Sequence, residues 1–329
     1  KDKNLFVFSS EVKAFYKAGI KKFEIEKNKL NEFLVHGSIY GQKTLHKNIY
    51  ELKPGNYLFG SKDFIKVNKY WDAIKSKKNQ KNRLNNISKQ IEENLIKTIE
   101  EWCSSDVKVG SLLSGGLDST FVSTIASKFR KIEMFTNYFP DRKKEDNETI
   151  LAGLIAKRTK SKHHKVKVKD NFSINNIEKL VSHLCDPIQD LNSLSFMALC
   201  KYIKLNTNIK VVLTGEGSDE LFGGYDRHQG ISETYKKSKN FNDILYAMNY
   251  LSSDRLKYFF NTKYTLSAHR KKIVNEFKNT NYSVLNKVLI HDQKTFLPGY
   301  LDRVDKISMM YGLEVRTPFL DERIISIAN

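Results

Sequence analysis

Between residues 107 and 215 the sequence repeats one alternation, which restricts the possible folds more than any other feature of the chain. Short apolar runs rich in β-branched and aromatic residues read as buried strands, at 107–113, 132–139, 163–169 and 209–215. Segments with helical spacing of apolar residues separate or follow them, at 119–129, 147–160, near 174–184 and near 192–205. Strands that alternate with helices predict a parallel sheet covered by helices on both faces, a doubly wound α/β fold of the Rossmann-like type.

Helical patterns flank this alternating region. An amphipathic helix is predicted from about 84 to 103, because apolar residues recur every three or four positions: Ile87, Ile91, Leu95, Ile99 and Trp102. Residues from about 231 to 310 read as helices only. We therefore predict one domain over 84–329 with a helical carboxyl-terminal part, preceded by a lysine- and asparagine-rich linker over 73–83.

Residues 1–72 predict a separate α+β segment. Residues 5–8 read as a strand, and a serine of SSEVKAF is expected to cap the short helix that follows. A second short helix is expected to stop at Gly37. The stretch 52–72 then predicts a Pro-Gly turn followed by a strand hairpin.

Composition argues against some partners and environments. The net charge of +19 would suit nucleic acid, but the lysines are spread along the whole chain, so we expect no nucleic-acid partner. No stretch approaches the roughly 20 apolar residues of a membrane span, and no secretory signal is visible. Three cysteines without a CxxC pair favour a reducing compartment, so we expect a cytoplasmic protein. Because the first residue is Lys1, we expect the chain to be a piece of a longer protein.

The loop after the first of these strands, SLLSGGLDST, is nearly bare of large side chains. Gly115 and Gly116 let backbone N–H groups close on a bulky anion, serine hydroxyls flank them, and the helix that follows adds its positive end. This combination predicts a phosphate site. The loop lacks the lysine of a Walker-type loop, and its charged residue, Asp118, can hold Mg²⁺ beside phosphates. The alternative is a glycine turn in which Asp118 caps the helix.

A second glycine-bearing loop, LTGEGSDELFGGY, follows the last of these strands. Glu216, Asp219 and Glu220 lie close together in it. If the two loops sit at adjacent strand ends, Asp118 and Asp219 share a metal and Glu216 faces the reacting centre. The alternative is a helix start capped by Ser218, where acidic residues suit the helix dipole.

A third candidate block, LPGYLDRVDKISMMYGLEVRTPFLDER, lies near the end of the chain. Its cations are spaced among aspartates: Arg303, Lys306 and Arg316. Because an arginine fork suits a carboxylate or a phosphate, Arg316 is a candidate ligand contact. The alternative is a salt-bridged helix followed by a buried turn.

Together the three blocks resemble one family of enzymes. SGGLDS resembles the pyrophosphate loop of the PP-loop ATP pyrophosphatases. TGEGSDELFGGY and GLEVRTPFLDER resemble, more narrowly, the synthetase domain of glutamine-dependent asparagine synthetases, and the DP in HLCDPIQD also matches that pattern. FSSEVKAF, ELKPGNYL and YWD are similar to the end of the Ntn-type glutaminase domain that precedes it in the family.

The resemblance implies a ligase of asparagine biosynthesis that uses ATP and Mg²⁺. In this reaction the side-chain carboxylate of aspartate attacks the α-phosphate of ATP, which gives β-aspartyl-AMP and pyrophosphate. Ammonia from glutamine hydrolysis then displaces AMP. The implied partners are these small molecules, with a homodimer left open.

The resemblance also assigns roles to residues by their position in the motifs. ATP and pyrophosphate are implied to bind at the loop and at the strand ends: Leu113, Ser114, Gly115, Gly116, Leu117, Asp118, Ser119, Asn137, Thr214 and Gly215. Asp118 and Asp219 are implied as Mg²⁺ ligands, and Glu216 as the glutamate needed for the adenylate step. Arg316 is implied as a substrate or phosphate contact.

The chain departs from the family pattern at both ends. The glutaminase nucleophile of the family is an N-terminal cysteine, whereas residue 1 is Lys1, and the family's catalytic lysine lies well beyond the PFLD block. We expect this chain alone to be unable to hydrolyse glutamine and to be weak or inactive in synthesis. Three alternatives stay open: an amidotransferase for another carboxylate such as a sugar or antibiotic precursor, a PP-loop tRNA-modifying enzyme, and a remnant that binds ATP without turnover.

Overall fold

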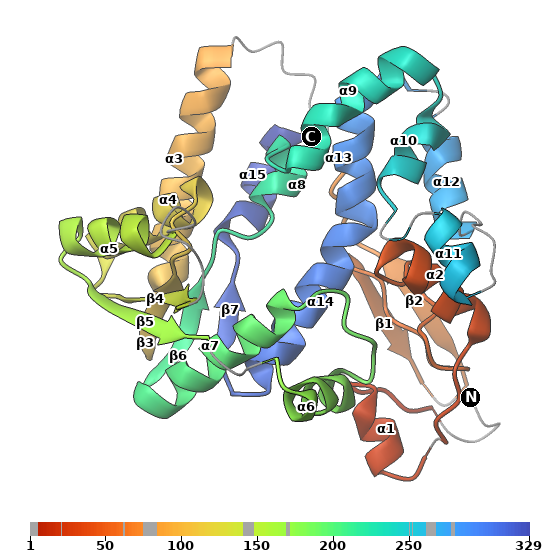
Figure 1. Cartoon of the computed structure of the whole chain (residues 1–329), viewed down its shortest axis with the longest axis horizontal. Helices are drawn as coiled ribbons and strands as arrows, with labels where there is room; N and C mark the ends of the chain where they lie inside the picture. Colours follow the sequence, from red (N-terminus) through yellow and green to blue (C-terminus); the bar gives the residue numbers. More distant parts are fainter. Residues whose placement is uncertain are drawn as a thin grey trace. The chain divides into compact units, whose positions relative to one another are not determined.

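The computed structural model describes residues 6–20, 22–61, 63–74, 84–140, 148–168, 172–249, 251, 253–260, 268–277 and 280–329. The chain divides into two compact units, whose elements are labelled in Figure 1. The sheet unit consists of residues 77–218 and 302–328. The hairpin unit consists of residues 1–76, 219–301 and 329.

A five-stranded parallel sheet is the centre of the sheet unit, with the strand order β5-β4-β3-β6-β7. Its strands are β3 Lys108–Leu112, β4 Glu133–Tyr138, β5 Lys162–Lys167, β6 Ile209–Leu213 and β7 Glu314–Arg316. The first four match strands predicted from the sequence, so the predicted α/β class is confirmed. The three residues of β7 are too few to show a strand pattern, and only their pairing with β6 defines them as a strand.

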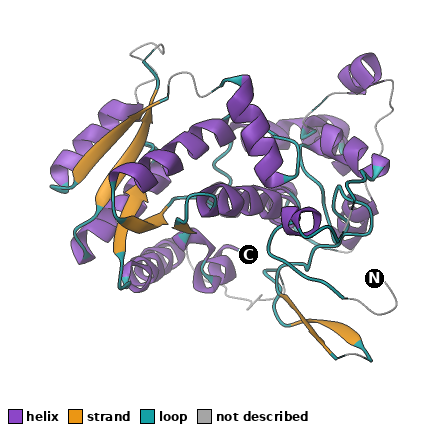
Figure 2. Cartoon of the chain, turned by 90° about the horizontal axis from the view of Figure 1, so that it is seen from below, coloured by secondary structure: helices purple, strands orange, loops and turns teal. Residues whose placement is uncertain are grey.

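Helices cover both faces of this sheet, which Figure 2 shows with the strands in orange. They are α3 Leu84–Cys103, α4 Leu117–Phe129, α5 Glu148–Arg158, α6 Ile174–Leu184, α7 Asn192–Asn206, α15 Glu322–Ala328 and the 3-10 helix η2 Pro318–Leu320. Side chains alternate between the faces along a strand. Phe135 belongs to a buried cluster with residues of α6 and α7, whereas its neighbour Met134 is equally buried and lies near Thr159, at the end of α5. Both faces are therefore core, as predicted.

The order of the strands places a switch point beside β3. From β3 the chain proceeds to β4 and β5 on one side, then crosses to β6 on the other side of β3. In open α/β sheets, ligands bind at the carboxyl ends of the strands where the order reverses in this way. The loops that follow β3 and β6 both lie at this position.

The hairpin unit contains two antiparallel strands, β1 Asn56–Gly60 and β2 Ile65–Lys69, which confirms the predicted hairpin. Its helices are α1 Lys13–Lys17, α2 Lys27–His36, α9 Asp226–Ser238, α10 Phe241–Ala247, α11 Ser253–Phe260, α12 Ala268–Phe277 and α13 Val284–Lys294. The division between the units falls within α8 Ser218–Phe222 and α14 Phe296–Met309. The helical prediction for 231–310 is confirmed over its described part. None of the described helices combines the length and the apolar character needed to cross a membrane.

Near the amino terminus the predictions for the first strand and the first helix cap are wrong. Residues 6–8 form no strand, and α1 begins after Val12 without a side-chain cap. The reason is local, because the Ser9 hydroxyl accepts the N–H of Glu11 two residues later and makes a turn before the helix. Gly37 does end α2, with a left-handed φ of 73°.

The predicted domain boundaries stay predictions. Residues 75–83 of the predicted linker lie outside the described residues. The two compact units also follow a different division from these boundaries, since residues 219–301 belong to the same unit as the first 76 residues.

Candidate active site

The loops that follow β3 and β6 form the candidate active site. β3 and β6 are adjacent parallel strands, and Ser111 pairs with Leu213 near their carboxyl ends. The first loop leads into α4, and the second leads into α8. The two glycine-bearing sequences therefore meet at one edge of the sheet, which is the arrangement on which the sequence prediction depended.

The second loop packs directly on the first. A Cβ added to Gly215 would lie 2.7 Å from the backbone nitrogen of Ser119 and 2.9 Å from Cβ of Asp118. The hydroxyl of Ser218 donates a hydrogen bond of 2.9 Å to Oδ1 of Asp118. Glycine at position 215 is thus needed for this close approach, and Asp118 is bonded to the other loop instead of capping α4.

The first loop is suited to an anion. Gly115 has a left-handed φ of 94°, and the N-cap position of α4, Gly116, contributes no side-chain cap. The hydroxyls of Ser114 and Ser119 are 2.8 Å apart, and the N–H of Gly116 donates to Ser114 Oγ at 3.2 Å. The side chain of Leu117 is 84% exposed. The N–H groups of the first turn of a helix have no acceptor within the helix, so they are available to an anion at this end.

The residues predicted to line a nucleotide pocket lie at the carboxyl ends of three strands: Leu113 follows β3, Asn137 lies near the end of β4, and Thr214 and Gly215 follow β6. Leu113 is buried, and its carbonyl accepts a 2.5 Å hydrogen bond from the hydroxyl of Thr136. Nδ2 of Asn137 donates to the carbonyl of Ser195 at 3.4 Å. Oδ1 of Asn137 is buried and has no hydrogen-bond partner among the described residues. A buried acceptor of this kind is costly unless a donor reaches it, and the amino group of a nucleobase is such a donor.

The acidic residues of the second loop have different surroundings. The N–H of Thr214 donates to the carbonyl of Arg316 at 3.0 Å, and Thr214 Oγ1 accepts the N–H of Glu216 at 3.0 Å. Glu220 is 1% exposed, and its carboxylate accepts a 2.6 Å hydrogen bond from the hydroxyl of Tyr225. Burial raises the pKa of Glu220, and the hydrogen bond from Tyr225 opposes this rise. Glu220 is therefore part of the packing of the loop.

The basic residues of the third block are engaged within the sheet unit. Arg303 donates to Gln189 at 2.8 Å, and Lys306 lies 2.6 Å from Asp302. Arg316 donates to the carbonyl of Trp102 at 2.6 Å and to Glu314 at 2.7 Å. The alternative prediction, a salt-bridged helix followed by a buried turn, thus describes α14 and η2 well. A direct ligand contact by Arg316 stays a prediction.

The donor set for a metal is small. Among the described residues, no group of three or more His, Cys, Asp or Glu side chains could hold a metal ion. Mg²⁺ needs fewer protein ligands, because it keeps waters and binds through one or two carboxylates together with substrate phosphates. Asp118 lies beside the anion loop and fits this role, and Asp219 follows Ser218 directly in the chain. The pairing of the two carboxylates on one ion stays a prediction.

Two family models match consecutive parts of the chain. The model described as asparagine synthase matches residues 90–329, which is more than half of the chain. The chain belongs to the asparagine synthase family. A second model, described as a glutamine amidotransferase domain, matches residues 1–71. The resemblance seen in the sequence is confirmed for both parts.

Several curated proteins are similar to this family member. Glutamine-hydrolysing asparagine synthetase 1 of Bacillus subtilis (strain 168) is 24% identical over an alignment of 359 positions, which covers 98% of this chain and 56% of that protein. Synthetase 3 of the same organism is 27% identical over an alignment of 351 positions, which covers 99% of this chain and 55% of that protein. The amidase chry2 of Gibberella zeae is 29% identical over an alignment of 209 positions, which covers 58% of this chain and 31% of that protein. The chain spans about half the length of the two synthetases.

The contacts that complete the site could not be recognised in the sequence. The side chain of Leu320 fills the space beside Gly217, where an added Cβ would overlap it. Thr136, which binds the carbonyl of Leu113, lies in a strand without any motif. Each contact joins positions far apart in the chain, and no local pattern of residue types indicates such a pair.

Proposed function

We propose that this member of the asparagine synthase family contributes to the ATP-dependent amidation of aspartate to asparagine. The observation that carries the proposal is the direct packing of the two glycine-bearing loops at the switch point of the sheet. Gly215 lies against Asp118 and Ser119, and Ser218 is hydrogen-bonded to Asp118. A bare, anion-directed loop beside a carboxylate supports a site for a departing pyrophosphate and its cation.

In this proposal the loop from Ser114 to Ser119 binds the phosphates of ATP through backbone N–H and serine hydroxyl groups. Leu113, Asn137, Thr214 and Gly215 line the nucleotide pocket. The unpartnered Oδ1 of Asn137 supports this placement, because it can accept a hydrogen bond from a base. Mg²⁺, held by Asp118 and Asp219, would neutralise charge on the phosphates.

The chemistry proposed is an adenylation followed by an aminolysis. The carboxylate of aspartate attacks the α-phosphate, β-aspartyl-AMP forms, and pyrophosphate leaves against the anion loop, where fixed donors stabilise the charge that develops. Ammonia, supplied by glutamine hydrolysis in the longer proteins of the family, then displaces AMP. Glu216, whose N–H is held by Thr214, is proposed for the adenylate step.

Two alternative reactions are tRNA modification and the amidation of another carboxylate. Membership of the asparagine synthase family favours amidation over tRNA modification. The acceptor is less restricted, since the proteins similar to this chain include one named an amidase. Exchange of labelled pyrophosphate into ATP, measured with a panel of carboxylic acids, identifies the acid that is adenylated. Because we expect this chain alone to be weak in synthesis, we expect weak exchange that depends on aspartate. Exchange with another acid but not with aspartate would overturn the acceptor that we propose.

The Gly215→Ala variant tests the site itself. Its new methyl group would meet Asp118 and Ser119, so we expect at least a tenfold loss of affinity for ATP with Mg²⁺, since about 1.4 kcal/mol of lost binding energy is tenfold. The matched control is Gly230→Ala, because Gly230 lies exposed in α9 with no atom within 4 Å of an added Cβ. Titration calorimetry measures the affinity of both variants for ATP with Mg²⁺. Equal affinity in Gly215→Ala and Gly230→Ala would contradict the placement of ATP at these loops.

A further inference from the structure

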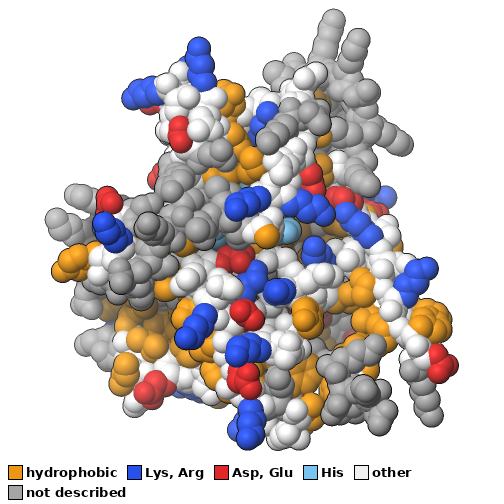
Figure 3. Space-filling model, turned by 90° about the vertical axis from the view of Figure 1, so that its right-hand side faces the viewer, with side chains coloured by type: hydrophobic (Ala, Val, Ile, Leu, Met, Phe, Trp, Pro, Cys, Tyr) orange, Lys and Arg blue, Asp and Glu red, His pale blue; other side chains and the backbone are white. Residues whose placement is uncertain are grey.

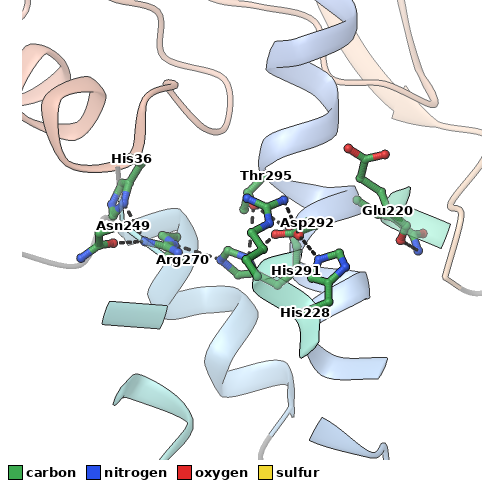
Figure 4. A network of polar contacts seen from close by, with 10 residues as sticks. His36, Glu220, His228, Asn249, Arg270, His291, Asp292 and Thr295 are labelled. Carbon is green, nitrogen blue, oxygen red and sulfur yellow. Dashed lines mark hydrogen bonds and ion pairs between the residues drawn. The ribbon is translucent and has the colours of Figure 1, made fainter. Parts of the chain in front are cut away.

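A second set of polar side chains lies buried within the hairpin unit. Arg270 of α12 is 2% exposed and Asp292 of α13 is 1% exposed. A buried guanidinium or carboxylate costs folding free energy unless hydrogen bonds satisfy it. The hydrogen-bond partners of these two residues therefore offset the cost of burying their charges. Together with their hydrogen-bond partners, these two residues form the Arg270–Asp292 network, which Figure 4 shows in part. Its members are His36, Arg227, His228, Asn249, Arg270, His291 and Asp292.

Arg270 joins three segments that are distant in the chain. Its Nη1 donates to Nδ1 of His36, the last residue of α2, at 2.6 Å. The same atom donates to Oδ1 of Asn249 at 2.9 Å, and Nε donates to Nε2 of His291 at 2.9 Å. Because the guanidinium can only donate, His36 and His291 must both present unprotonated nitrogens to it.

Asp292 joins α13 to the start of α9. Its Oδ2 accepts hydrogen bonds from Nη2 of Arg227 at 2.8 Å and from Nε2 of His228 at 3.0 Å. His291 connects the two halves of the network, since its Nε2 accepts from Arg270 and its proton therefore sits on Nδ1. That Nδ1 lies 3.5 Å from Oδ1 of Asp292.

The Asp292 half of the network continues into residues 219–225. The guanidinium of Arg227 lies 4.6 Å from the ring centroid of Tyr225, and the Tyr225 hydroxyl donates to Glu220 at 2.6 Å. Nε2 of Gln293, next to Asp292 in the chain, donates to the carbonyl of Glu220 at 3.1 Å. Residues 219–225 comprise most of α8 and the three residues after it, and they are called the turn from here on. This turn is thus held from both α9 and α13.

The carboxylate of Asp219 takes its orientation from this turn. The N–H of Gly223 donates to the carbonyl of Asp219 at 2.8 Å. A Cβ on Gly224 would overlap Oδ1 of Asp219, so the carboxylate lies over bare backbone at Gly224. Any displacement of residues 220–225 would therefore change where this carboxylate points.

We infer that the Arg270–Asp292 network positions Asp219, and that it couples α2 to the turn over residues 219–225. α2 belongs to the part of the chain matched by the glutamine amidotransferase model, and the turn belongs to the part matched by the asparagine synthase model. The network residues act through Tyr225 and Glu220 and touch no substrate. The inference rests on the proposed function in one respect, which is that Asp219 binds Mg²⁺.

Hydrogen–deuterium exchange of the amides of residues 219–225 tests the coupling without any assay of activity. His36→Phe removes an acceptor of Arg270, and we expect exchange in the turn to become at least about tenfold faster, because hydrogen bonds to charged groups contribute enough to stability for this change. His46→Phe is the matched control. His46 is also buried in the amino-terminal segment, and it binds the hydroxyl of Tyr16 at 2.7 Å outside the network.

Equal exchange rates over residues 219–225 in His36→Phe and His46→Phe would overturn the inference. If thermal unfolding shows that His36→Phe does not fold, Asn249→Ala takes its place, because it removes another acceptor of Arg270, and the same two outcomes apply. Binding of ATP with Mg²⁺ to the wild-type chain is measured separately. Its absence would end the proposed function and leave the exchange result, and hence the coupling, intact.

Discussion

At positions 215 and 217 a single methyl group decides whether the loop after β6 can lie against its neighbours. A Cβ on Gly215 would meet Asp118 and Ser119. Gly217 has a left-handed φ of 89°, and an added Cβ would overlap the side chain of Leu320. The two glycines thus have different reasons to be glycine, since the first needs space and the second needs both space and a backbone conformation that other residues rarely adopt.

Substitution of Gly217 separates these two requirements. In Gly217→Ala we expect a loss of about 1–2 kcal/mol from the left-handed backbone and about 1–3 kcal/mol from overlap with Leu320. In the background of Leu320→Ala only the first loss remains, so the cost of Gly217→Ala falls. Urea unfolding of the four proteins of this double-mutant cycle measures the difference. A cost of Gly217→Ala that is the same in both backgrounds contradicts the packing of Leu320 on this turn.

At the scale of elements, polar side chains connect helices α2, α12 and α13. His36 lies at the end of α2, Arg270 on α12 and His291 on α13, and all three are buried. Burial and then the charge of Arg270 lower the pKa of His36 to about 2. Burial also lowers the pKa of His291 to about 4, although its hydrogen bond to Asp292 acts in the opposite direction. The contacts of Arg270 with α2 and α13 therefore require His36 and His291 to be neutral.

This need predicts a loss of stability in acid. Below an unfolded pKa near 6.5 the unfolded chain binds protons at His36 and His291, whereas the folded chain does not until about pH 2 and about pH 4 respectively. As the pH decreases from about 6 to about 4, the free energy of unfolding therefore decreases by up to about 1.4 kcal/mol per pH unit for each histidine. Urea unfolding across this range measures the slope. His36→Phe should lower it, and an unchanged slope in that variant would argue against a buried neutral His36.

At the scale of the whole molecule the net charge is +19, and on the face seen in Figure 3 the coloured basic side chains form no single dominant patch. Lysine and arginine side chains (blue) are interleaved there with acidic residues (red). Specific recognition of a nucleic acid requires positive charge gathered along a groove or helix, together with contacts to bases. The expectation that the chain has no nucleic-acid partner stays a prediction.

Binding of tRNA should consequently be non-specific and sensitive to salt. Attraction that arises from released counterions weakens steeply as salt rises, so we expect any affinity at about 50 mM salt to drop at least tenfold by about 200 mM. Fluorescence anisotropy with labelled tRNA measures this decrease, with an unrelated RNA of the same length as the control. Affinity that persists at the higher salt and distinguishes tRNA from the control would revive a tRNA-modifying role.

The parallel sheet, the helix over Leu84–Cys103 and the place of both glycine-bearing loops at strand ends followed from the sequence alone. Each depends on periodicity and residue type within short windows, and burial of alternating apolar faces leaves few other folds. The family could also be recognised at this level, because its motifs are contiguous.

The tertiary structure alone decided which distant side chains meet. It added β7 to the edge of the sheet, seated Leu320 beside Gly217 and brought His36 to Arg270 across 234 positions of the chain. It also grouped residues 219–301 with the amino-terminal segment in one compact unit. Contacts of this kind depend on how whole elements pack, and a buried polar group is satisfied by whichever partner the packing brings near, so local patterns in the sequence carry no sign of them.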